Sequence, residues 1–167
     1  TGADWSEPRL NYRYGMLACA PTDPLRETVD ALRMRYDAAY AGSNPPFIVV
    51  SQPFARIPEP HEIESLKKTV QAMRPFQIRV GPAIPSPNSR QLCFDLWPQA
   101  RLLDLREHLH ATGLFRTDLK FTKNYIFHMK ITETDRDLKE VDRMIKEVNE
   151  RYPPFETTCA DFTWVVP

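Results

Sequence analysis

Three polar side chains at alternate positions, His128, Lys130 and Thr132, interrupt an otherwise apolar stretch of the chain. Residues two apart on a β-strand point to the same face, so all three are expected on one polar strand face. An imidazole that titrates near neutral pH can move a proton, whereas an ammonium or a hydroxyl can hold an anion such as phosphate. The reference pKa of lysine, about 10.4, makes Lys130 an anchor or an acid but a poor base. We therefore predict that these three residues carry catalysis or phosphate binding.

Four further residues are candidates for the same site. Ser51 supplies a hydroxyl directly after the apolar residues 47–50 of the predicted strand 47–52 and is the fourth catalytic candidate. Arg79, Lys123 and Tyr125 are candidates for phosphate or nucleotide contact, because cations neutralise phosphate and aromatic rings stack on bases. Each also has a plainer interpretation. Ser51 and Tyr125 would then be packing residues, and Arg79 and Lys123 would lie on a solvated sheet face and in a solvated basic loop.

The periodicity of apolar residues predicts the elements that carry these candidates. Leu25, Val29, Leu32 and Tyr36 recur at helical spacing, whereas residues 76–80 alternate at the period of a strand. Predicted strands cover residues 11–19, 47–52, 76–80, 92–97, 124–132 and 155–166, and predicted helices cover residues 24–36, 63–73, 102–109 and 135–148.

The order of these elements is β-α-β-α-β in each half of the chain. A short repeat accompanies it, since residues 49–51 before one helix correspond to residues 130–132 before another. We predict an α+β fold and a single domain over residues 1–167, with two duplicated halves around a central groove. Its sheets should be antiparallel, with the helices on the outside.

Charge and cysteine content narrow the classes of function. The chain has 22 Lys and Arg and 22 Asp and Glu residues, so bulk charge attracts it neither to nucleic acid nor to membranes. Cys19, Cys93 and Cys159 are few and widely spaced, which predicts reduced thiols in a cytoplasmic protein rather than disulfides or a zinc site. No apolar stretch approaches the length of a membrane span. We expect a monomer without metal, cofactor or membrane partner.

Three segments in this order resemble the 2H phosphoesterase superfamily, which includes 2′-5′ RNA ligase-like proteins and cyclic phosphodiesterases. They are residues 46–54, residues 75–81 with 89–96, and residues 127–132. The resemblance implies a His-x-Thr/Ser motif on each of two strands that face one groove. It also implies that one imidazole acts as base and the other as acid, while the hydroxyls hold the phosphate of a nucleotide or RNA.

The sequence departs from that pattern in both halves. The first expected histidine falls on Phe47 or Val49, and the residue two before Thr132 is Lys130. Three hypotheses follow. The chain binds nucleotide or RNA phosphate without turnover, it is an active phosphodiesterase that uses His128 in an unusual site, or it is a non-catalytic protein-interaction domain.

Overall fold

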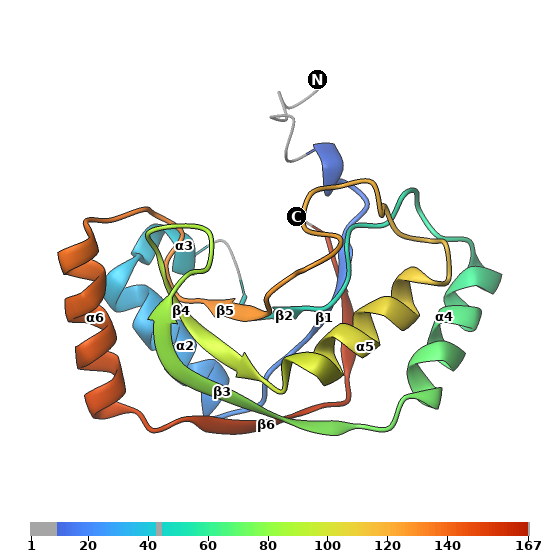
Figure 1. The fold of residues 1–167 in the computed structure, drawn as a ribbon. Coiled ribbons are helices and arrows are strands. Elements are labelled where there is room, and N and C mark those ends of the chain that lie inside the picture. Colours follow the sequence, from blue (N-terminus) through green and yellow to red (C-terminus); the bar gives the residue numbers. More distant parts are fainter. Residues whose placement is uncertain (1–9, 43–44, 167) are drawn as a thin grey trace.

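The computed structural model describes residues 10–42 and 45–166 (Figure 1). Its strands are β1 (Met16–Cys19), β2 (Ile48–Val49), β3 (Phe76–Pro85), β4 (Leu92–Trp97), β5 (His128–Lys130), β6 (Phe155–Cys159) and β7 (Phe162–Val165). Its helices are α2 (Leu25–Tyr36), α3 (Ala38–Ala41), α4 (Pro60–Ala72), α5 (Gln99–His110) and α6 (Leu138–Arg151). None of the described helices is long and apolar enough to cross a membrane.

The strands form two antiparallel sheets, which confirms the predicted α+β class. One sheet has the order β2-β1-β7, and the other has the order β5-β4-β3-β6. The helices lie to either side of the sheets, with α2, α3 and α6 at one end of the molecule and α4 and α5 at the other (Figure 1).

The two halves of the chain exchange strands. Strand β3 comes from the first half but pairs with β4 of the second, whereas β7 comes from the end of the chain and pairs with β1. The prediction of one strand over residues 155–166 was therefore wrong. The chain leaves the larger sheet after Cys159 and joins the smaller sheet at Phe162, so β6 and β7 belong to different sheets.

Four other predicted strands have different limits. Strand β1 begins at Met16, five residues later than predicted, because residues 10–14 adopt helical and turn conformations. Strand β2 is only two residues long, because the N–H groups of Val50 and Ser51 both bond to the carbonyl of Leu17 and end the regular ladder. Strand β5 begins at His128, four residues later than predicted. Strand β3 runs on to Pro85 through an irregularity at Gly81, where φ is 115°. Such a φ is open to glycine and strained for other residues.

The helices cover the sheets through the apolar stripes that the sequence shows. In α6, Val141, Met144 and Val148 are buried at helical spacing, and this helix packs on β3 and β4. Asp137 begins the helix by accepting a hydrogen bond from the Lys139 backbone N–H. The cysteines at 19, 93 and 159 are buried free thiols, as the sequence predicted.

Candidate functional site

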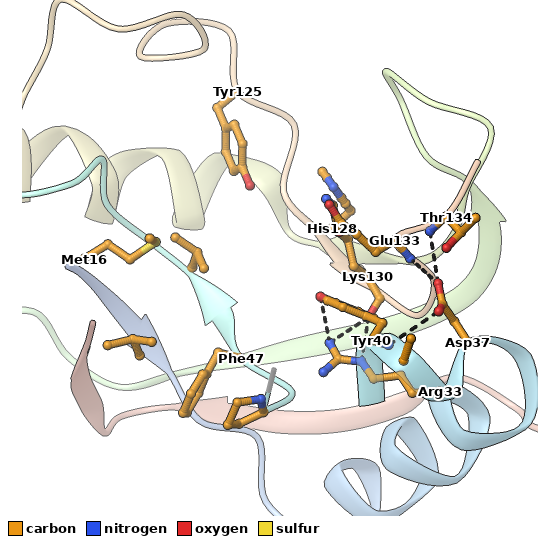
Figure 2. Close-up of a pocket in the computed structure, with 14 residues that line it drawn as sticks. Met16, Arg33, Asp37, Tyr40, Phe47, Tyr125, His128, Lys130, Glu133 and Thr134 are labelled. Atoms are coloured by element: carbon orange, nitrogen blue, oxygen red, sulfur yellow. Dashed lines mark hydrogen bonds and ion pairs between the residues drawn. The ribbon is translucent and has the colours of Figure 1, made fainter. Parts of the chain in front are cut away.

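A cavity of about 640 Å³ lies between the smaller sheet, strand β5 and the helices α2 and α3 (Figure 2). Its lining residues come from both halves of the chain and are Met16, Arg33, Asp37, Ala39, Tyr40, Pro45, Phe47, Val49, Tyr125, His128, Lys130, Glu133, Thr134 and Val165. We call this cavity the groove. It brings Phe47 and Val49 of the first half to the same space as His128 and Lys130 of the second.

The wall of the groove formed by the smaller sheet is apolar. Met16 of β1 pairs with Val165 of β7. Val49 belongs to β2, which pairs with the other edge of β1. Phe47 precedes β2 and also lines the groove (Figure 2). These four side chains carry no group that could hold a charge or move a proton.

The opposite wall is polar and includes His128 at the start of β5. Its Nδ1 lies 2.8 Å from the carbonyl oxygen of Ile126. A carbonyl only accepts, so Nδ1 carries the proton and Nε2 keeps its lone pair. Burial lowers the pKa of His128 and the charge of Lys130 lowers it further, although the bond to Ile126 opposes both. His128 is therefore a neutral imidazole at pH 7.

Lys130 lies two residues further along the same strand face, separated from His128 by the buried Met129. Its ammonium donates to a carboxylate oxygen of Glu133 at 2.7 Å, and about a third of its side chain is exposed. Its backbone carbonyl accepts two hydrogen bonds from Arg33, at 3.2 Å from Nε and 2.8 Å from Nη2. The ammonium thus faces the groove, while the backbone behind it is fixed.

Arg33 is a buried cation that we did not predict. Its side chain is 1% exposed, and its guanidinium lies 4.4 Å from the centre of the Tyr40 ring. Burial lowers its pKa from the ordinary arginine value, yet that value is so high that Arg33 remains charged at pH 7. The sequence carried a signal for it. Arg33 follows Val29 by four positions, so it falls on the apolar stripe of α2.

Asp37 holds the chain next to the groove in place. Its carboxylate accepts the backbone N–H groups of Glu133 and Thr134 at 2.9 and 3.0 Å, and that of Tyr40 at 3.4 Å. Burial alone would raise the pKa of Asp37, but these N–H groups together lower it. The role of Asp37 is to join α3 to the turn after β5.

Tyr125 also lines the groove, although alternation along an uninterrupted strand over residues 124–132 would direct it away from the face of His128 and Lys130. The reason is that β5 begins only at His128, and Asn124 has a φ of 57°, so alternation does not apply to this segment. The Tyr125 ring lies 4.4 Å from the guanidinium of the buried Arg106, and burial raises the pKa of its phenol. Its hydroxyl is directed toward the groove (Figure 2).

The structure does not place Ser51 and Thr132 in the groove. Both are buried, and both accept a backbone N–H, Ser51 from Leu17 at 2.9 Å and Thr132 from Leu92 at 3.0 Å. The backbone N–H groups of Val50 and Ser51 both donate to the carbonyl of Leu17. In the same way, the backbone N–H groups of Ile131 and Thr132 both donate to the carbonyl of Leu92. Each hydroxyl therefore completes the end of a strand pair, and neither residue lines the groove.

This matching pattern fixes the correspondence between the two halves. Since Ser51 matches Thr132, Val49 matches Lys130 and Phe47 matches His128. The match extends to the helices. Arg106 of α5 donates to the carbonyl of Val50 at 3.2 Å, and Arg33 of α2 donates to the carbonyl of Lys130 at 2.8 Å, one position earlier in the matched segment.

The other two predicted contact residues lie away from the groove. Arg79 is exposed on β3, with its guanidinium 5.3 Å from the ring of Trp97. Lys123 is exposed in the loop before β5. Arg79 therefore lies on a solvated sheet face and Lys123 in a solvated loop, as in the second of the two interpretations of each residue. In the described part of the chain, no three His, Cys, Asp or Glu side chains gather closely enough to hold a metal ion.

Two antiparallel sheets that exchange strands between matching half-chains, with a groove lined by both halves, define the class of two-lobed phosphoesterase folds. The family model described as the 2′-5′ RNA ligase superfamily matches residues 21–166, and the chain belongs to that superfamily. This confirms the resemblance to the 2H phosphoesterases. The chain is also similar to a protein of Halalkalibacterium halodurans named "Putative phosphoesterase BH1439", with 28% identity over 121 residues, which are 71% of this chain and 68% of the relative.

Proposed function

We propose that this protein binds the phosphate ester of a nucleotide or an RNA end in the groove without turning it over. One observation carries the proposal. The two matching positions from which a pair of imidazoles would face each other hold Val49 and Lys130. Valine moves no proton, and an ammonium beside a phosphate stays protonated, so the pair of opposite protonation states that acid–base catalysis needs is missing.

The polar wall supports a phosphate ester as the ligand. Lys130 offers an ammonium to the groove, and the phenol of Tyr125 offers a hydroxyl. The two bonds from Arg33 hold the backbone behind Lys130, so its position is set before a ligand arrives. The relative from Halalkalibacterium halodurans is named a phosphoesterase, which supports the same class of ligand.

A second candidate is slow hydrolysis with His128 as the base. The specific observation that favours it is the hydrogen bond from Nδ1 to Ile126, which leaves the Nε2 lone pair of a neutral imidazole in a residue that lines the groove. Lys130 would then be the proton donor. A site with one imidazole in place of two should give a low rate, because acid–base catalysis needs two groups that are held in opposite protonation states.

The test measures binding and turnover separately. The ligand is 2′,3′-cyclic AMP, the binding assay is calorimetry, and the variants are Lys130→Met and the control Lys123→Met, which removes an exposed lysine outside the groove. We expect the wild type and the control to bind alike, Lys130→Met to bind roughly tenfold more weakly, and no protein to hydrolyse the ligand appreciably.

Two results would overturn this proposal. Turnover by the wild type that disappears in His128→Ala would establish the second candidate instead. Absence of binding to cyclic and linear nucleotides and to short RNA would favour the non-catalytic protein-interaction hypothesis, for which the apolar wall would be the contact surface.

A further inference from the structure

Four charged side chains line the groove within the described residues, and their formal charges cancel. Arg33 and Lys130 are cationic, whereas Asp37 and Glu133 are anionic. Asp37 is 7% exposed and is engaged by three backbone N–H groups. Glu133 differs from it, because about half of its side chain is exposed and its carboxylate is bonded to the Lys130 ammonium. An incoming phosphate must therefore share Lys130 with Glu133.

The apolar wall offers no compensation for a second negative charge. Met16, Phe47, Val49 and Val165 have neither a cation nor a hydrogen-bond donor in their side chains. A phosphate diester, including a cyclic one, carries one negative charge. A phosphate monoester carries roughly 1.5 to 2 at pH 7, because its second pKa is about 6. The second charge of a monoester would lie near the Glu133 carboxylate with only one shared ammonium between them.

We infer that Glu133 sets the charge selectivity of the groove, so that singly charged phosphate diesters bind in preference to doubly charged monoesters. This inference rests on the proposed function, since it specifies which phosphate esters the groove accepts. Two like charges about 5 Å apart at a partly exposed site change an affinity by roughly fivefold to tenfold at low salt. Glu133 is thus a specificity-determining residue that acts by repulsion, which is a common way to discriminate between ligands.

The experiment compares two ligands that differ in phosphate charge, 2′,3′-cyclic AMP and 3′-AMP. Calorimetry at pH 7.5 and low ionic strength gives the ratio of their dissociation constants for the wild type and for Glu133→Gln. Glutamine keeps the size of the side chain and leaves unchanged the backbone N–H that bonds to Asp37. The matched control is Asp135→Asn, which removes one carboxylate from an exposed residue that does not line the groove.

We expect the wild type and the control to favour the cyclic ester by about tenfold, and Glu133→Gln to reduce that ratio by roughly fivefold or more, mainly through tighter binding of 3′-AMP. An unchanged ratio in Glu133→Gln, with both ligands bound, would overturn the inference and leave the proposed function standing. If neither the wild type nor Glu133→Gln bound either ligand, the proposed function would fall, and the inference with it.

Discussion

His110, at the end of α5, makes the stability of this protein depend on pH. Its Nε2 accepts a hydrogen bond from the backbone N–H of Gln52 at 2.9 Å, which fixes the segment that follows β2. Burial, followed by the charge of Arg106, lowers the pKa of His110 to about 4. Protonation would remove the lone pair that accepts this bond and would place a second cation beside Arg106.

The direction of the effect follows from proton binding. The pKa of His110 is about 4 in the folded state, against 6.5 for an unperturbed histidine. The unfolded chain therefore binds more protons between these values, so the stabilisation is fully present above pH 6.5 and is lost as the pH falls through about 4. A shift of this size corresponds to at most about 3 kcal/mol, and we expect about 2 kcal/mol because the ring is partly exposed.

The assay is urea unfolding from pH 7.5 to pH 4.5 for the wild type and His110→Gln. Glutamine can accept the Gln52 bond but does not titrate, so the variant should lose about 2 kcal/mol less stability over this range. Groups that titrate equally in both proteins, including His128, cancel in the comparison. The exposed His61→Gln serves as the control and should follow the wild type. Parallel curves for the wild type and His110→Gln would refute the reasoning.

Three further predictions concern the groove and its supports. Ser51→Ala and Thr132→Ala should each lower the free energy of unfolding by about 1 to 2 kcal/mol in urea titrations, because each leaves a buried backbone N–H unpaired, and neither should change the dissociation constant of 2′,3′-cyclic AMP. Arg33→Met should cost about 2 to 4 kcal/mol by the same titration, since the carbonyl of Lys130 loses both donors; a smaller loss would mean that water replaces them. The double variant Val49→His/Lys130→His should gain measurable turnover of 2′,3′-cyclic AMP over the wild type, because it places an imidazole at each matching position, and failure to gain any would contradict the correspondence between the halves.

The alternation of residues in β5 was readable from the sequence because it reflects simple burial. His128 and Lys130 are partly exposed and line the groove, whereas Phe127, Met129 and Ile131, which alternate with them, are buried. The same rule failed for Thr132, which is fully buried although it continues the polar spacing. The strand has ended at that point, and the hydroxyl is used to close the strand pair rather than to face the groove.

The supports of the groove were harder to find because they depend on contacts that are distant in sequence. Asp37 bonds to Glu133 and Thr134, which follow it by 96 and 97 positions, and no local pattern indicates such a pairing. Arg33 was detectable as a cation on an apolar helix stripe, but its partner, the carbonyl of Lys130, was not. Sequence periodicity predicts which residues are buried, whereas the partner of a buried polar group depends on how the two sheets are placed.

The exchange of strands between the halves has a consequence for how this chain must fold. A fragment that ended after β3 would leave β1 without its neighbour β7, and a fragment that began at β4 would lack β3, the strand that joins β4 to β6. Each fragment would expose open sheet edges, which favour aggregation. We therefore expect that the duplicated halves cannot be separated into autonomous units, and that β7 must reach β1 before the smaller sheet is complete.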